Sequence, residues 1–284
     1  MGRTAPRCPR PATGYQPPML LYDIADATPQ LNVKPDEEEG KTMDAGNKYV
    51  LAFNSSPHKE KGFTAMVLDR FMAGASSAGA ETETVYLAKK KIADCLGCAW
   101  CWFKTPGICR HKDDVPALHE KMLRADVIVY ATPLYVCNMS GALKRFMDRI
   151  MPLAEPYQEY HDGICTHPSV YRKDVRNVLV STCGFPGLRN FDPLVMTVER
   201  MMEVGGGNLH AAILFPSSVL LARDPCPASE QLDHVYRAGI EVVGAGIGGE
   251  TVQGYSRPYV EPQTYVDELN AVFRTLRENA PRNS

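Results

Sequence analysis

The chain has 284 residues, of which 44% are hydrophobic and 23% charged, so it is long enough to bury the core of one large domain or two small ones. Its formal net charge of −2, without a basic run, gives no electrostatic reason to expect nucleic acid or an anionic membrane as a partner. No stretch approaches the roughly 18 consecutive apolar residues of a membrane span, and the N-terminus lacks the apolar core of a secretory signal, so we expect a cytoplasmic protein.

Residues 1–46 are rich in proline and polar residues and include the acidic run DEEEG. This composition predicts a poorly ordered N-terminal arm, in which MLLYDIA at 19–25 is a candidate for one short additional strand. The remaining residues, 47–284, are expected to form one domain in which strand-like and helix-like segments alternate.

Five segments have the character of strands, and each is followed by a segment with helical periodicity. The expected strands are KYVLAF (48–53), ETETVYL (81–87), DVIVYA (126–131), RNVLVST (176–182) and LHAAILF (209–215). The expected helices are 62–78, 115–123, 140–150, 193–204, 230–243 and 265–278. This alternation predicts a doubly wound α/β fold, with a five-stranded parallel sheet, helices on both faces and a C-terminal helical extension. In such folds, ligands bind at the carboxyl ends of the strands.

The loop after the first strand, FNSSPHKEKGFT at 53–64, runs directly into a helix. Ser55, Ser56 and Thr64 offer hydroxyls, Gly62 lets the backbone bend, and the free amides at the helix start suit a phosphate. A turn that merely caps the helix is the alternative. The loop lacks the pattern G-x-x-x-x-G-K-[ST], which disfavours a nucleoside triphosphate.

Two further loops follow the third and fourth strands, TPLYVCNMSGALKRFMDRI at 132–150 and STCGFPG at 181–187. In the first, residues 132–135 are placed where a flat aromatic ligand can lie against backbone and ring. Asn138 and Ser140 can hydrogen-bond the edges of that ligand or cap the next helix. Because the three loops follow strands of one sheet, we expect them to form one site.

Four of the nine cysteines lie within fifteen residues, at the spacing C-x2-C-x2-C-x7-C. In a reducing cytosol, clustered cysteines are more often metal, cluster or redox sites than structural disulfides. The segment also holds Trp100 and Trp102, which either shield such a site or belong to the core. KDDV at 112–115 is interpreted as a helix start, where carboxylates meet the positive end of the helix dipole.

With these motifs the sequence resembles the flavodoxin-like NAD(P)H-dependent FMN reductases, in particular their iron–sulfur flavoprotein branch. The resemblance covers roughly residues 48–215 and rests on NSSPHKEKGFT, the cysteine spacing followed by KDDV, ATPLYVCNMSGALKRFMDR and STCGFPG. It implies an FMN-dependent oxidoreductase that takes a hydride or electrons from NAD(P)H or a reduced carrier, and a homodimer or homotetramer. The electron donor and acceptor would be small molecules or proteins.

The resemblance also implies which residues contact FMN. Those at the phosphate are Ser56, His58, Phe63 and Thr64; those at the isoalloxazine ring are Pro133, Leu134, Tyr135, Asn138 and Met139 on one side and Cys183, Gly184 and Phe185 on the other. Phe63 replaces the asparagine that the family usually has there, so only its backbone amide can contribute. Because the flavin carries the chemistry, no catalytic acid or base is assigned.

By the same resemblance, Cys95, Cys98, Cys101 and Cys109 would ligate a [4Fe-4S] cluster, which requires four thiolates. Zinc and redox-active or merely reduced thiols remain open alternatives. For the whole protein, the alternative is a non-catalytic electron-transfer protein that shuttles electrons between partner enzymes.

Two other segments complete the expectations. GAGIGG at 244–249 matches the dinucleotide-binding pattern G-x-G-x-x-G only loosely and follows a helical pattern, so it is interpreted as a loop that ends a helix. The insertion at 155–174 breaks the alternation, and we expect it to cover the open face of the flavin or to lie in a subunit interface.

Overall fold

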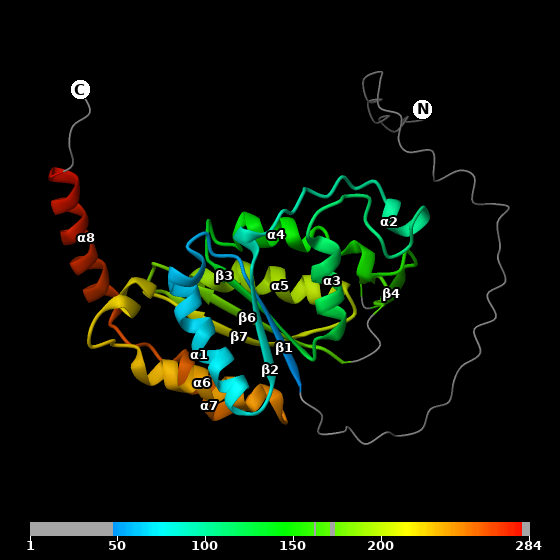
Figure 1. Cartoon of the computed structure of the whole chain (residues 1–284). Coiled ribbons are helices and arrows are strands. Elements are labelled where there is room, and N and C mark those ends of the chain that lie inside the picture. Colours follow the sequence, from blue (N-terminus) through cyan, green and yellow to red (C-terminus); the bar gives the residue numbers. More distant parts are fainter. Residues whose placement is uncertain (1–47, 162, 171–173, 280–284) are drawn as a thin grey trace, which may run out of the picture. The chain divides into compact units, whose positions relative to one another are not determined.

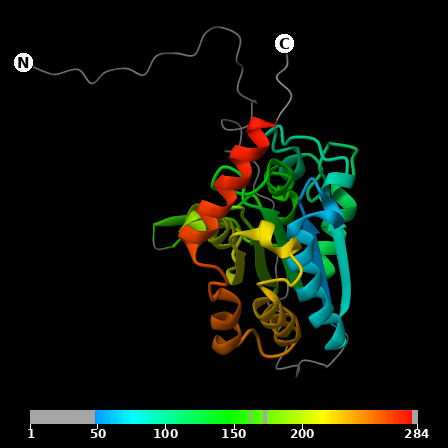
Figure 2. The same ribbon diagram turned by 90° about the vertical axis from the view of Figure 1, so that its left-hand side faces the viewer.

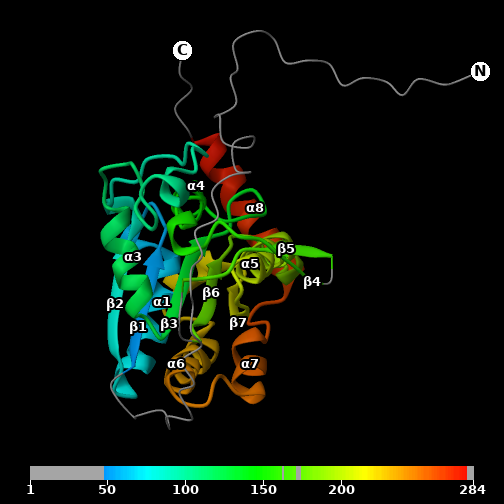
Figure 3. The ribbon, with the colours of Figure 1, turned by 90° about the vertical axis from the view of Figure 1, so that its right-hand side faces the viewer.

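The computed structural model describes residues 48–161, 163–170 and 174–279. The expected N-terminal arm, with its candidate strand at 19–25, lies outside the described residues. Five parallel strands form a sheet in the order β2-β1-β3-β6-β7, which Figure 3 shows side by side. Their bounds are β1 Tyr49–Asn54, β2 Glu81–Tyr86, β3 Val127–Pro133, β6 Arg176–Thr182 and β7 Leu209–Phe215. The predicted five-stranded doubly wound sheet is confirmed.

Burial explains why the central strands lack alternation of apolar and polar residues. Every residue of β1 and β3 is buried, because helices cover both faces of a parallel sheet. The strand β2 lies at an edge, and its sequence ETETVY leaves only Val85 buried. The sequence pattern of a strand therefore indicates whether it lies in the centre of the sheet or at its edge.

Helices cover the two faces of the sheet (Figure 1). α1 (Phe63–Ser77) and α6 (Ser229–Val243) pack on one face, and α3 (Val115–Arg124), α4 (Gly141–Met147) and α5 (Asp192–Val204) pack on the other. α1 and α6 approach each other closely at glycines. A Cβ at Gly239 would lie 2.0 Å from the carbonyl oxygen of Phe71, so a residue with a side chain does not fit there. These helices match the expected ones to within a few residues, although α4 stops three residues early.

The C-terminal part holds one helix that the sequence did not predict. The loop GAGIGG ends α6 as expected, but α7 (Gly249–Ser256) begins at its last residue. α8 (Pro262–Glu278) follows, and the carboxylate of Glu261 caps it by accepting from the Thr264 N–H at 2.7 Å. Only Tyr265 of α8 is buried, and Figure 1 shows the helix projecting beyond the sheet and the helices that cover it, while Figure 2 views the molecule from the side on which α8 lies.

The remaining elements are short. The insertion contains an antiparallel hairpin of β4 (Glu159–His161) and β5 (Ile164–Thr166), and the cysteine segment contains α2 (Trp100–Phe103). The 3-10 helices are η2 Lys59–Lys61, η3 Leu87–Lys89, η4 Met151–Leu153, η5 Leu188–Phe191 and η6 Ser218–Ala222. Within the described ranges, none of the helices has the length and apolar character that crossing a membrane requires.

Candidate functional site

The three predicted loops lie side by side at the carboxyl ends of β1, β3 and β6. The Ser55 hydroxyl donates to the carbonyl oxygen of Ala131 at 3.0 Å, and the Ser140 hydroxyl bonds the Ser55 hydroxyl at 2.9 Å. The Leu134 N–H donates to the carbonyl oxygen of Thr182 at 2.8 Å. β1 and β3 are the neighbouring strands between which the strand order reverses, which is where ligands bind in open α/β sheets.

The first loop has the features of an anion site. Its Ser56 is 3% exposed, and the N–H groups of Phe63 and Thr64 open the first turn of α1, where they have no partner within the helix. Because Gly62 has no side chain, the space next to the Ser56 hydroxyl stays open. A Cβ at this position would lie 2.7 Å from the hydroxyl oxygen. Beneath the loop, Asn54 Nδ2 is a buried donor without a partner in the described structure.

Two of the residues expected at the phosphate also make contacts within the protein. The hydroxyl of Thr64 points inward and shares a hydrogen bond of 2.8 Å with the hydroxyl of Thr182. The imidazole of His58 lies at the exposed rim, while its backbone N–H donates to the Ser56 hydroxyl at 3.3 Å. Thr64 therefore faces the loop mainly with its backbone amide, as Phe63 does.

The second loop makes a tight turn after Pro133. The backbone of Tyr135 and that of Asn138 exchange two hydrogen bonds, of 2.9 and 3.1 Å, and Val136 and Cys137 between them have positive φ angles of 48° and 61°. This turn leaves Val136 99% exposed and Tyr135 46% exposed. The turn thus exposes an aromatic and an aliphatic side chain at the edge of the sheet.

Asn138 and its neighbours hold this turn in place. The Asn138 amide donates to the hydroxyl of Thr197 on α5 at 3.1 Å, and its Oδ1 accepts from the Met139 N–H at 2.8 Å. Ser140 is the N-cap of α4, whose Leu143 N–H donates to the Ser140 hydroxyl. Ser140 thus has the expected role of a helix cap, and Asn138 holds the loop against α5.

The third loop faces the second. Cys183 is buried, and burial, together with the nearby thiol of Cys137 on the second loop, raises the pKa of Cys183. Its sulfur accepts from the Phe185 N–H at 3.3 Å, and the Phe185 ring is 66% exposed. The carbonyl oxygen of Gly184 accepts from the hydroxyl of Tyr265 at 2.5 Å, so α8 is anchored at this site. No motif in the sequence marked Tyr265.

These features fit a flavin mononucleotide. A helix N-terminus, a serine hydroxyl and the orphaned Asn54 amide suit a phosphate, and Gly62 keeps open the space that a side chain would fill. Exposed apolar groups on two facing loops suit the ring. The whole set lies at one edge of the sheet.

The cysteine segment is attached at the other end of α4. Directly after this helix, Arg149 is only 1% exposed, and its guanidinium donates to both oxygens of Asp113, at 2.7 and 3.2 Å. The same guanidinium donates to the carbonyl oxygen of Ala93 at 2.7 Å and to the sulfur of Cys109 at 3.3 Å. One buried cation thus binds both ends of the segment that carries the four thiols.

Asp113 stays ionised because of this pair. Burial by itself raises the pKa of Asp113, but the hydrogen bonds from Arg149 and from the Ala93 and Val115 N–H groups hold it below its usual value. The bond to Val115, the first residue of α3, agrees with the expected helix start. The partnership with Arg149 was not predicted, because a lone arginine in MDRI has no pattern that distinguishes it from a surface residue.

A second side chain attaches the segment from its middle. Trp102 Nε1 donates to the carbonyl oxygens of Met151 and Ala154, at 3.1 and 2.8 Å. Its ring lies 4.9 Å from the ring of His167 in the insertion, centre to centre. Trp102 is therefore a structural contact, whereas Trp100 is 39% exposed.

The four thiols lie near one another without forming a closed site. Burial raises the pKa of Cys101, and the charges of Cys109, Cys98 and Cys95 raise it further, so all four are within electrostatic range. In the described residues, no three metal-ligating side chains converge at coordination distance. The chemistry of the donor set fits an iron–sulfur cluster or zinc, and the eight cysteines from Cys95 onward are all free.

The insertion lies against the cysteine segment. Besides the Trp102–His167 contact, the Glu155 N–H donates to the carbonyl oxygen of Pro168, and the His167 N–H to that of Val204 at the end of α5. The expected position of the insertion over the open face of the flavin stays a prediction. A role in a subunit interface stays a prediction.

The order of the strands and a site at the β1/β3 switch point define a flavodoxin-like protein. In agreement, the NAD(P)H:quinone oxidoreductase from Methanothermobacter marburgensis superposes with a TM-score of 0.51 at 19% identity, covering 69% of this chain and 99% of that one.

A model of the NADPH-dependent FMN reductase family matches residues 49–164. The chain is 38% identical over 109 residues to an iron-sulfur flavoprotein of Methanocaldococcus jannaschii, over 38% of this chain and 55% of that protein. A second iron-sulfur flavoprotein of the same organism is 42% identical over 138 residues, 47% of this chain and 64% of that protein. The chain spans about half the length of the curated relatives it matches. Over the matched residues the chain is similar to the NADPH-dependent FMN reductase family and to iron-sulfur flavoproteins.

Proposed function

We propose that the chain is an FMN-dependent oxidoreductase whose flavin lies at the carboxyl edge of the sheet. The observation that carries the proposal is the convergence of the three loops, with an open space over Ser56 and the buried Asn54 Nδ2, a donor without a partner in the described structure. FMN held there would supply the redox chemistry between NAD(P)H or a reduced carrier and an electron acceptor.

The residues of the chain bind and orient the flavin. The Ser56 hydroxyl and the amides of Phe63 and Thr64 donate to the phosphate, where the helix dipole of α1 favours negative charge. Tyr135 and Phe185 would cover the ring from the two facing loops. The raised pKa of Cys183 keeps its thiol neutral, so no anion is added beside the ring.

We also propose that Cys95, Cys98, Cys101 and Cys109 hold a [4Fe-4S] cluster. Support comes from the four free thiols, from the names of the relatives, and from Arg149, a buried cation beside Cys109 that would offset the negative charge of thiolate ligands. Zinc uses the same donors and is an outcome of the test below.

The protein is proposed to act in the cytoplasm as a homodimer or homotetramer. The apolar side chains of Val272, Phe273 and Leu276 on α8 are 52–62% exposed, which supports association between copies. Because α8 is anchored beside the flavin loops through Tyr265, such an interface would adjoin the site.

An absorption spectrum of protein purified without oxygen tests both cofactors. Bound FMN gives absorption bands at about 370 and about 450 nm, and a cluster adds a broad shoulder at about 400 nm that dithionite bleaches. Steady-state oxidation of NAD(P)H with a quinone or free flavin as acceptor then separates an enzyme, which turns over, from an electron carrier, which does not. Protein without flavin bands would refute the proposed function.

The variant Cys98→Ala tests the ligand set. It should abolish iron and acid-labile sulfide and leave most of the FMN bound, because the flavin loops belong to the sheet and not to the cysteine segment. The matched control is Cys165→Ala, an exposed cysteine of the hairpin, which should keep both cofactors. Wild-type protein with FMN but without iron would refute the cluster, and zinc in its place would select the alternative.

A further inference from the structure

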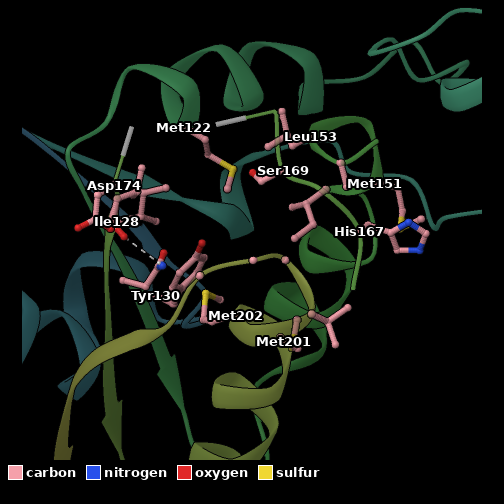
Figure 4. Close-up of a pocket in the computed structure, with 18 residues that line it drawn as sticks. Met122, Ile128, Tyr130, Met151, Leu153, His167, Ser169, Asp174, Met201 and Met202 are labelled. Atoms are coloured by element: carbon pink, nitrogen blue, oxygen red, sulfur yellow. Dashed lines mark hydrogen bonds between the residues drawn. The ribbon is translucent and has the colours of Figure 1, made fainter. Parts of the chain in front are cut away.

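A second cavity lies near the amino ends of β3 and β6, at the opposite end of the strands from the three loops (Figure 4). Its volume is about 260 Å³. The walls come from β3, α3, η4 and the end of α5, and four of the side chains are methionines: Met122, Met151, Met201 and Met202. Methionine is flexible and polarisable, so such walls adapt to apolar ligands.

One polar group in this cavity has no partner. Tyr130 is 4% exposed, its hydroxyl makes no hydrogen bond within the described structure, and Figure 4 shows the side chain pointing into the cavity. Buried tyrosine hydroxyls normally find a partner, and an unpaired one lowers stability. Burial raises the pKa of Tyr130, so the group keeps its proton and can donate it to an acceptor.

Two nearby polar side chains are already paired. The Asn177 amide donates to the carbonyl oxygens of Val175 and Asn208, and the His167 ring is bonded to the carbonyl oxygens of Glu155 and Tyr157. Ser169 and the exposed Asp174 also line the cavity. The cavity thus combines mainly apolar walls with one hydroxyl donor that has no partner within the described structure. This combination is typical of small-molecule sites, where a few polar groups fix the orientation.

The size of the cavity limits the ligand. A cavity of about 150 Å³ lined by apolar side chains takes up benzene, so the larger space here has room for a compound of two fused rings. A carbonyl oxygen on such a ring would accept the hydrogen bond of Tyr130.

The cavity adjoins the cysteine segment. Met151 and Ala154 line it, and their carbonyl oxygens accept from Trp102, the neighbour of Cys101. His167 lines it too and stacks on the same indole. A ligand here would lie next to the residues that bind Trp102, at the opposite end of the strands from the three loops.

We propose that this cavity is a second binding site, which takes an apolar, ring-containing small molecule with a carbonyl oxygen, held by a hydrogen bond from Tyr130. The site is independent of the proposed function, because none of its residues belongs to the three loops.

The test uses two probes that differ in one group: 1-tetralone, a two-ring ketone, and tetralin, the corresponding hydrocarbon. Calorimetric titration of the purified holoprotein should show the ketone binding about fivefold tighter than the hydrocarbon, the effect of one hydrogen bond. In Tyr130→Phe both should bind equally. This variant should fold, because the hydroxyl it removes has no protein partner.

Two controls locate the site. Tyr86→Phe, which removes a hydroxyl far from the cavity, should keep the fivefold preference. Met201→Trp, which places a large ring at the half-buried wall, should abolish binding of both probes while FMN content stays unchanged. Absence of binding to wild type, an unchanged preference in Tyr130→Phe, or full binding in Met201→Trp would each overturn the proposal.

Discussion

The three loops proposed to bind the flavin and the cysteine segment lie at opposite ends of α4 and are held in different ways. The loops continue directly out of buried strands, and hydrogen bonds among Ser55, Ala131 and Ser140 join one loop to the next. The cysteine segment contains one four-residue helix, and Cys95 within it is exposed. It is attached to the rest of the protein through Arg149 and Trp102.

The two regions should therefore differ in how strongly their structure depends on single side chains. Where the sheet sets the backbone, a loop keeps its place when one side chain changes, so substitutions should affect ligand binding more than folding. Where individual side chains attach a segment, removing one of them should loosen the whole segment.

The largest effect is expected for Arg149→Met, which removes one attachment and leaves the carboxylate of Asp113 buried without its partner. Breaking such a pair costs about 3 kcal/mol or more of unfolding free energy, measured by urea denaturation. The double variant Arg149→Met/Asp113→Asn should recover part of this loss, because the unpaired charge is gone. A loss below about 1 kcal/mol in the single variant would show that the segment does not depend on the pair.

Ser56→Asp tests the other side of the comparison. A carboxylate set against the phosphate dianion should weaken FMN binding about 100-fold or more, without unfolding the protein. Flavin content after purification and the urea midpoint measure the two effects. Ser76→Asp, the same charge change near the far end of α1, is the control and should retain FMN. Undiminished flavin in Ser56→Asp would remove this loop from the site.

A smaller effect concerns His119 on α3, which is 6% exposed and whose Nε2 is buried without a partner in the described structure. Burial lowers its pKa from 6.5 to about 4. Between these values the unfolded chain binds a proton that the folded protein does not, so stability falls as the pH drops from 6.5 towards 4.

From pH 6.5 to 5 this contribution amounts to roughly 2 kcal/mol. Urea unfolding of the wild type and of His119→Gln at several pH values measures it. The variant should show a shallower decline over this range. Equal slopes would mean that His119 does not titrate as its burial requires.

The smallest effect is expected for Trp102→Phe, which removes both hydrogen bonds to the carbonyl oxygens of Met151 and Ala154. A loss of about 1 kcal/mol is expected, with faster hydrogen exchange in residues 95–109 and unchanged FMN content. Trp100→Phe is the control, because its ring is largely outside the core. Slowed flavin binding in Trp102→Phe would contradict the independence of the two regions.

Much of the fold was predictable from local sequence. Strands such as VIVYATP are apolar throughout because both faces of a central parallel strand are buried, and the loop GAGIGG ended α6 as its glycines indicated. α7 was missed because it begins within this glycine-rich loop. The hairpin β4–β5 was missed because each strand has only three residues and none of them is buried, so no core imposes a hydrophobic pattern on the sequence.

The sequence by itself determined the strand–helix order and therefore the edge where the loops meet, because hydrophobic periodicity and turn residues are local properties. It could not show that the Thr64 hydroxyl bonds Thr182, that Arg149 joins Asp113 to Cys109, or that Tyr130 faces a cavity with a free hydroxyl. These contacts join residues from different parts of the chain, 118 positions apart for the two threonines and 40 for Arg149 and Cys109. Only tertiary packing decides them, because a side chain's partner depends on what the fold brings beside it and not on its neighbours in sequence.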